Sequence, residues 1–347
     1  MAIFKSVFES QTDEFDVELE AKEADYTFDE SDTFDDTLTE YCKEMYALDA
    51  VMYISDIQLE TAVFEGSIES VETLAEKTLG DFFESIKKKI TEIWYKIKDW
   101  IREKIMNIRA GFAAASSFMK KHGDSIPAML DKGAKEYKFT GYAYNAIDIL
   151  SQTFDKVGSK IEGDMTSAMS ATTAPDTSSS ELIGEIGKMF KGDAQIHTIA
   201  ELGTVILEYA RGTHRVDHHP EPAEATPWVK TCKAAADILK NIDGAGQKVE
   251  KNVKKSISEL KKLESQAKKN DRDNDAAVYH AKARYLAQLI AIQSKCTTYT
   301  INATIEGIKA MSSRCKAIYK KGKGTKADEN VSASYIPNLF ENAFNYL

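Results

Sequence analysis

Residues 81–121 read DFFESIKKKITEIWYKIKDWIREKIMNIRAGFAAASSFMKK, and this stretch decides the fold. Its large apolar residues recur every three or four positions, which places them along one side of a helix. They are Phe82, Phe83, Ile86, Ile90, Ile93, Trp94, Ile97, Trp100, Ile101, Ile105, Ile108 and Phe112. No proline interrupts the stretch, so the pattern predicts one amphipathic helix of about 40 residues and about 60 Å, with Gly123 supplying the stop.

The composition of the whole chain agrees with a helical protein. Of its 347 residues, 43% are apolar and 29% are charged, which predicts a folded body. Only 6 prolines and 18 glycines are present, too few for the many tight turns of a β-rich protein. We therefore predict an all-α fold, in which long amphipathic helices form an elongated helical bundle behind an acidic, largely disordered N-terminal leader.

Changes in composition divide the chain into segments. Residues 10–40 consist mainly of Asp, Glu, Thr and Ser, and their mutual repulsion argues against a packed core. Linkers rich in Ser and Thr, or in Pro and His, separate the later helical patterns. The predicted segments are a leader at 1–65, a long amphipathic helix region at 66–163, a Ser/Thr linker at 164–180, short helices at 181–211, a His/Pro loop at 212–227, a basic helical bundle at 228–322, and a connector with a terminal amphipathic segment at 323–347.

Local patterns add detail within these segments. An aromatic run at 136–145 predicts a short extended piece, and Pro227 is expected at the first position of a helix capped by Thr226. The basic segment is predicted to hold three helices, over 228–241, 247–269 and 276–320. Its β-branched patch at 297–304 has weak helix propensity, which favours a kink or an interruption of the helix there over an ordinary helical stretch.

The charge is divided unevenly along the chain. The net charge is −10, yet residues 1–80 carry 4 basic and 22 acidic groups, whereas residues 229–347 carry 22 basic and 12 acidic groups. A basic rear part either pairs with the acidic front or contacts a polyanion such as DNA, and solvated helix faces of varying sign are the plainer alternative. The candidate polyanion contacts are Lys254, Lys255, Lys261, Lys262, Lys268 and Lys269. Aromatic residues are sparse there, so base-specific recognition is not predicted.

The long helix has two possible partners for its apolar stripe. Trp94, Ile97, Trp100 and Ile101, flanked by lysines, are typical of a helix that lies in a membrane interface. The same pattern suits a helix packed against its neighbours in a bundle, and we favour core packing. No window reaches about 18 uninterrupted apolar residues.

Residues that would indicate catalysis or metal binding are few. His214, His218 and His219 share one loop with acidic neighbours, but zinc sites usually draw ligands from separate elements, so an exposed polar loop is the favoured interpretation. The four cysteines form no CxxC pair, which argues against a zinc site or a disulfide scaffold. No nucleophile elbow, phosphate loop, dinucleotide fingerprint or HExxH motif occurs. We expect no enzyme activity, no metal and no cofactor.

The first third of the chain resembles a class of phage protein. The opening MAIFKSVFES, the acidic leader, the sequence VFEG at 63–66 and the Lys/Trp/Ile helix after it are similar to internal or capsid-associated virion proteins of large tailed bacteriophages. The resemblance implies a multi-copy structural protein, made in the bacterial host cytoplasm and found in the phage particle. It also implies cleavage between Glu65 and Gly66, although Val63 stands where the commonest pattern has Leu or Ile.

Such cleavage would change the net charge of the chain from negative to positive. The leader 1–65 has 3 basic and 19 acidic groups, while residues 66–347 have 42 basic and 36 acidic groups. An acidic leader would then mask a basic body until DNA is packaged. The expected partners are other virion proteins, further copies of this chain and, non-specifically, DNA. Two alternatives remain at this point: a membrane-active protein that acts through residues 82–112, and a helical scaffold with protein partners only.

Overall fold

The computed structural model describes residues 68–175, 179–269 and 273–323. Helices account for 82% of these residues, which confirms the all-α prediction for this part of the chain. The predicted leader at 1–65 and almost all of the terminal segment at 323–347 lie outside the described residues.

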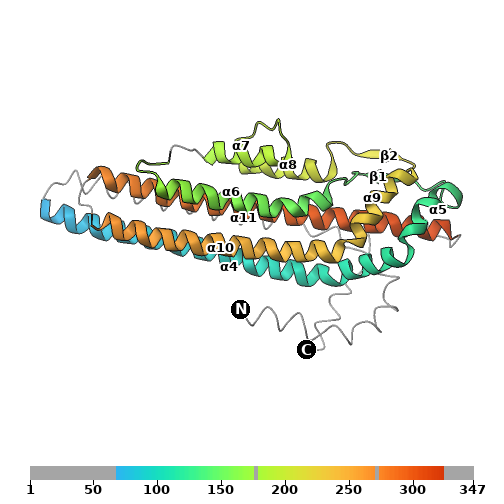
Figure 1. Cartoon of the computed structure of the whole chain (residues 1–347), viewed down its shortest axis with the longest axis horizontal. Helices are drawn as coiled ribbons and strands as arrows, with labels where there is room; N and C mark the ends of the chain where they lie inside the picture. Colours follow the sequence, from blue (N-terminus) through green and yellow to red (C-terminus); the bar gives the residue numbers. More distant parts are fainter. Residues whose placement is uncertain (1–67, 176–178, 270–272, 324–347) are drawn as a thin grey trace, which may run out of the picture.

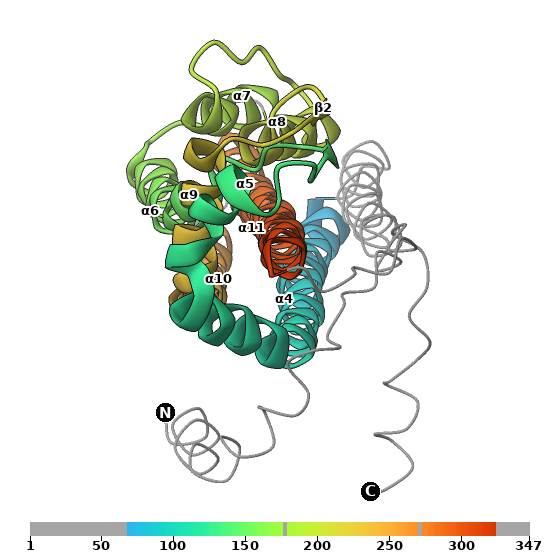
Figure 2. The same ribbon diagram turned by 90° about the vertical axis from the view of Figure 1, so that its right-hand side faces the viewer.

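Four long helices lie side by side along one axis (Figure 1). They are α4 (Ile68–His122), α6 (Ile147–Ser170), α10 (Ala235–Ala267) and α11 (Asp273–Gly322). Helix α4 packs mainly on α10, and α6 packs on α10 and α11. Seen from the end, α11 lies among the others, and its residues 291–300 are all buried (Figure 2). The core is therefore built around α11.

Shorter elements cover α11 on one side and close one end of the molecule. Helices α7 (Ser179–Phe190) and α8 (Ile199–Arg211) contact each other, and α8 lies against α11. Helices α5 (Ile126–Lys132) and α9 (Pro222–Lys233) pack together at the end where α4 and α11 finish (Figure 1).

Two short strands form an antiparallel ribbon beside α9. Strand β1 (Phe139–Gly141) pairs with β2 (Val216–His218), and Thr140 lies opposite Asp217. The extended piece predicted within 136–145 is therefore present, and its partner comes from the segment predicted to be a His/Pro loop.

The long helix predicted over 81–121 is present and starts earlier, at Ile68. Phe83, Ile86, Ile97 and Phe112 have no exposed surface, so this side of α4 contributes to the core. Burial of such side chains contributes about 1.5–3 kcal/mol each, which outweighs the modest helix propensity of β-branched isoleucine.

The last long helix is not interrupted at its β-branched patch. Helix α11 runs unbroken through the β-branched patch at 297–304. The hydroxyls of Thr298, Thr300 and Thr304 each donate to the carbonyl four residues earlier, over 2.7–2.9 Å. A buried threonine thus satisfies its hydroxyl inside its own helix, and the surrounding helices supply the stability that propensity lacks.

Two predicted boundaries are wrong because helices extend into the predicted linkers. Helix α6 continues to Ser170, since Met165 and Ala168 are buried against the core, so the Ser/Thr linker does not begin at 164. Helix α9 begins at Pro222, where Glu221 and Glu224 form a capping box. The loop predicted at 212–227 therefore holds β2 and the first half of α9, and the proline expected to begin a helix lies inside one.

The break predicted between 241 and 247 is also absent, because α10 runs through it. Gly246 is buried, and a Cβ atom placed on it would lie 3.4 Å from Cδ1 of Ile101 on α4. A Cβ atom would fit at this distance, so the packing does not require the glycine, and the helix continues because Ala245 and Val249 beside it are buried in the core.

Candidate polyanion interface

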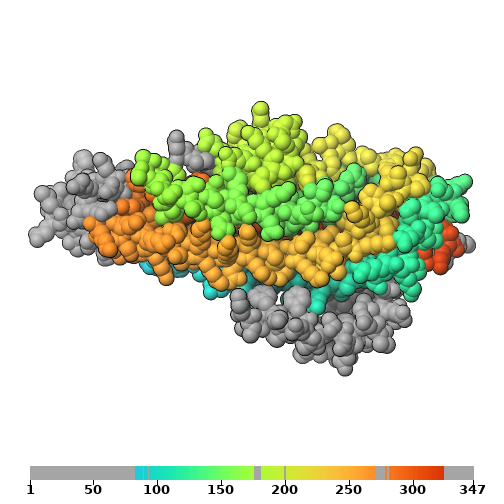
Figure 3. All heavy atoms as spheres, in the orientation of Figure 1, coloured from blue at the N-terminus to red at the C-terminus, as the bar shows by residue number. Residues whose placement is uncertain are grey.

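The lysines predicted to contact a polyanion lie along the second half of α10 and just beyond it. Helix α10, in yellow to orange, runs along the face of the molecule shown in Figure 3. Most of them pair with nearby polar groups of the protein itself. The contacts are Lys254 with Glu250 at 2.6 Å, Lys262 with Glu259 at 2.7 Å, Lys268 with Glu264 at 2.9 Å and Lys255 with the Thr166 hydroxyl at 2.7 Å. Lys261 and Lys269 are exposed. Lys254, Lys255, Lys261 and Lys262 thus lie on α10, Lys268 and Lys269 follow its end, and carboxylates lie among them.

Ion pairs join α10 to the neighbouring helices α4 and α6. Lys251 donates to Glu162 of α6 at 2.8 Å, and this hydrogen bond lowers the pKa of Glu162. Lys87 of α4 donates to Glu264 at 2.9 Å. Burial alone would raise the pKa of Glu264, but hydrogen bonds from Lys87 and Lys268 outweigh it and lower the pKa. These pairs stabilise the packing of α10.

Glu264→Gln is expected to lower the free energy of unfolding at pH 7 by about 1–2 kcal/mol, because Lys87 is buried and loses a charged partner. A carboxyl whose pKa is lowered on folding stabilises the protein above its unfolded pKa and loses that contribution as the pH falls through the folded value. The deficit of the variant should therefore shrink below about pH 4.5, the usual value for this carboxyl. Urea unfolding at pH 7 and pH 4 measures this, and a pH-independent deficit would contradict it.

A second group of lysines gathers at the end of the molecule where α4, α5 and α11 all finish (Figure 1). Each of these helices has lysine in its last turn. We call this surface the basic end, and define it by the exposed residues Lys120, Lys121, Lys132, Lys135, Lys320, Lys321 and Lys323. None of these lysines is among the six predicted polyanion contacts.

A contact between two glycines brings the lysines of α5 and α11 together. A Cβ atom on Gly133 would lie 2.6 Å from the carbonyl oxygen of Gly322, and one on Gly322 would lie 2.8 Å from the side chain of Met129. Because backbone meets backbone here, no side chain separates the two segments. Lys132 and Lys321, next to these glycines in sequence, are therefore held at the same end.

The described segments 120–136 and 320–323, which carry these lysines, contain three carboxylates: Asp124, Asp131 and Glu136. Asp124 pairs with Lys233 at 2.6 Å. Among the residues that the structure describes, Lys120, Lys121, Lys132 and Lys135 form no ion pair. The basic end therefore differs from the α10 face, where nearby carboxylates neutralise most of the lysines.

Aromatic rings lie beneath the basic end and hold some of its amino groups. Phe118 and Tyr319 meet edge to face at 5.3 Å, and His122 lies 4.4 Å from Tyr319. The Lys323 amino group lies 5.0 Å from the ring centre of Tyr319, and that of Lys321 lies 5.9 Å from the ring centre of Tyr137. These cation–π contacts orient two ammonium groups at the surface.

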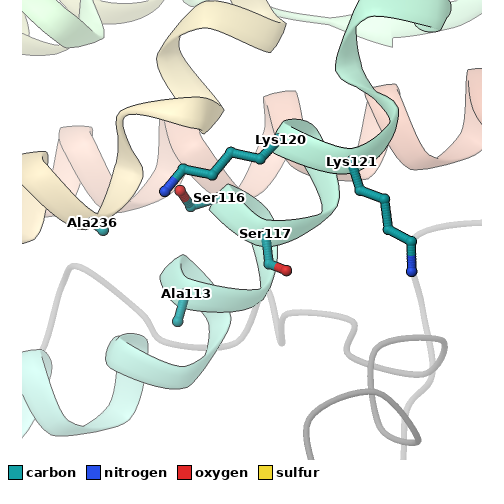
Figure 4. A pocket seen from close by; sticks show the side chains of 6 residues that line it. All are labelled: Ala113, Ser116, Ser117, Lys120, Lys121 and Ala236. Carbon is teal, nitrogen blue, oxygen red and sulfur yellow. The ribbon is translucent and has the colours of Figure 1, made fainter. Parts of the chain in front are cut away.

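An open depression lies beside the last turns of α4 (Figure 4). Its volume is about 550 Å³, and it is lined by Ala113, Ser116, Ser117, Lys120, Lys121 and Ala236. The hydroxyl of Ser116 donates to the carbonyl of Lys233 at 2.8 Å. Lys120 and Lys121 point to different sides of α4, so the basic surface extends around the helix.

The apolar stripe considered for membrane contact faces the core. Trp94, Ile97 and Ile101 are buried, and Trp100 is half-buried against them. Exposure of this stripe to lipid would require α4 to separate from its neighbours. None of the helices in the described part of the chain combines the length and apolar character that a bilayer span needs.

The three histidines considered for metal binding do not converge. Nε2 of His218 lies 2.7 Å from Glu224, Nδ1 of His219 lies 3.0 Å from the carbonyl oxygen of Tyr137, and His214 is exposed. Within 68–175, 179–269 and 273–323, no three His, Cys, Asp or Glu residues are grouped to hold a metal ion.

One buried cation has no counterpart in the sequence predictions. The guanidinium of Arg314 lies 4.2 Å from the ring centre of Phe139, 5.2 Å from that of Trp228 and 5.5 Å from that of Tyr144. Burial lowers the pKa of this side chain, and the aromatic faces compensate part of the lost hydration. Its role is to fasten the β1–β2 ribbon and α9 onto α11.

The predicted processing site, Glu65 and Gly66, lies outside the described residues. Comparison of the chain with protein-family models, with curated proteins and with solved structures finds no match.

Proposed function

We propose that this chain is a non-enzymatic structural protein of a tailed-phage virion, located inside or on the capsid. In this proposal it is an elongated bundle of amphipathic helices, present in several copies and bound to other virion proteins. It is made as a precursor, and cleavage after Glu65 removes the acidic leader. The remaining basic body contacts packaged DNA or the shell.

The observation that carries the proposal is the distribution of charge over the described helices. Along α10 the lysines pair with Glu162, Glu250, Glu259 and Glu264, which ties the helices together. At the basic end the lysines instead project from three helix termini with few carboxylates nearby. A stiff helical body with one cationic end suits a component that joins a polyanion to a protein assembly.

Mass spectrometry of purified phage particles tests this proposal. We expect peptides from 66–347 in several copies per particle and a mature chain that begins at Gly66. A chain that begins at residue 1 or 2 would remove the processing step, and absence of the protein from purified particles would remove the virion role.

A further inference from the structure

We infer that the basic end is a sequence-independent binding surface for the phosphate backbone of double-stranded DNA, and that the α10 lysines are not. This inference rests on the proposed function and names the surface that performs it. It replaces Lys254–Lys269, the region indicated by the sequence, with residues from three separate segments of the chain.

The first reason is the availability of charge. When DNA binds, a lysine that already pairs with a carboxylate either loses that ion pair or holds the carboxylate close to a phosphate of the same charge. Both outcomes weaken binding. Lys254, Lys262 and Lys268 are paired in this way, each with a glutamate three or four residues away. Lys120 and Lys132 have no such partner among the described residues, so their contact with phosphate releases counterions without that cost.

The second reason is the convergence of helices. A lysine in the last turn of a helix is favourable by itself, because it lies near the partial negative charge of the carbonyl end. That effect explains each helix separately but does not require three helices to end together. The contact between Gly133 and Gly322 joins the ends of α5 and α11, and residues 123–125 connect the end of α4 directly to α5. The segments 120–136 and 320–323 then present seven lysines. Their carboxylates are Asp131, Glu136 and Asp124, the last of which is paired.

The chemistry of the surface favours a nucleic acid over a membrane. Surface-bound helices hold a bilayer through exposed apolar side chains as well as through charge. The large apolar side chains that are exposed in the described residues are Tyr95, Met106 and Ile149, and none belongs to the basic end. The surface is thus purely electrostatic, which suits a phosphate backbone.

The same chemistry predicts that base sequence is not recognised. The basic end consists of lysines, which act as point charges on flexible stems, and lacks the planar guanidinium that pairs with guanine. Phe118, His122 and Tyr319 pack on one another within the protein. Affinity should therefore depend on salt much more than on sequence.

Two triple variants provide a matched test, each prepared as the full chain and as the mature chain 66–347 that the proposed cleavage leaves. The end variant is Lys120→Gln/Lys132→Gln/Lys321→Gln, and the control is Lys254→Gln/Lys261→Gln/Lys262→Gln. Each removes three positive charges, so the change in net charge is identical. The probe is a fluorescein-labelled DNA duplex of mixed sequence, and its anisotropy is followed over a salt series from about 50 to about 200 mM, the range where phosphate contacts dominate affinity.

We expect the end variant to bind at least about tenfold more weakly at the low-salt end, with a salt slope shallower by roughly 2–3. The control should change Kd less than about threefold and keep the slope of the unmodified chain. Far-UV circular dichroism checks that both variants remain folded. A duplex of a second sequence should bind equally well.

Several results would overturn the inference. Equal losses in the two variants, or a larger loss in the control, would assign binding to α10 or to net charge alone. Failure of the mature chain 66–347 to bind the duplex at low salt would also overturn it, as would binding to vesicles of phosphatidylserine and phosphatidylcholine in place of DNA. Presence of the chain in purified particles is measured separately, so the virion proposal can stand when this inference fails.

Discussion

Trp228→Ala is expected to lower the free energy of unfolding by about 3–5 kcal/mol, the range observed when a large aromatic residue is removed from a core. Trp228 is only 1% exposed. Its ring meets that of Phe139 edge to face at 5.3 Å, and its Nε1 donates to the carbonyl of Ala143 at 3.2 Å. The substitution leaves a cavity and an unpaired carbonyl in the same place.

The buried cation beside this ring increases the expected loss of unfolding free energy further. The Arg314 guanidinium has no ion-pair partner among the described residues and depends on aromatic faces for compensation. Removal of the indole takes away one of those faces, and a buried charge that loses a partner is strongly destabilising. The ribbon of β1 and β2 should loosen together with α9.

Trp228→Phe is the matched control for this prediction. It keeps a ring near Arg314 but removes the hydrogen bond to Ala143, so a loss of about 1–2 kcal/mol is expected. Urea unfolding followed by far-UV circular dichroism measures both variants. If the two variants lose the same unfolding free energy, the ring of Trp228 does not stabilise this end of the molecule.

The sequence predicted those helices and strands whose pattern lies within the element itself. The long helix follows from the three- and four-residue spacing over 81–121, and its start at Ile68 lies within a weaker continuation of the same pattern. The errors occurred where a residue's usual role was overridden by tertiary packing. Gly246 lies in contact with Ile101, and Pro227 sits inside a helix that a glutamate capping box begins five residues earlier.

The candidate site was harder to predict, because charge pairing is a tertiary property. The sequence showed a dense run of lysines at 254–269, and the same run contains the glutamates that neutralise it. The basic end draws on residues near 120, 133 and 321, which no periodicity connects. A local signal was nevertheless present: lysines lie in the last turns of three helices. That those turns meet depends on contacts such as Gly133 with Gly322.

The second large effect is expected at the point where α6, α10 and α11 meet. Asn252 of α10 has no exposed surface, and its Nδ2 donates to the carbonyl of Gly158 and to Oε1 of Gln293, both at 3.0 Å. Gln293 is 2% exposed, so water does not replace a lost partner. Asn252→Leu is expected to lower the free energy of unfolding by about 2–3 kcal/mol, because it leaves buried acceptors unpaired.

A double-mutant cycle separates this hydrogen bond from simple packing. Gln293→Met removes the other polar partner with little change in volume, so Asn252→Leu/Gln293→Met leaves no side-chain amide at the junction. Replacing both partners by apolar groups costs less than orphaning one of them, and we expect a favourable coupling of about 1–2 kcal/mol in urea unfolding. Losses that simply add, within about 0.5 kcal/mol, would show that Asn252 and Gln293 contribute through packing alone. The double variant should then be less stable than either single variant, whereas the hydrogen-bond account requires it to recover part of the loss caused by Asn252→Leu.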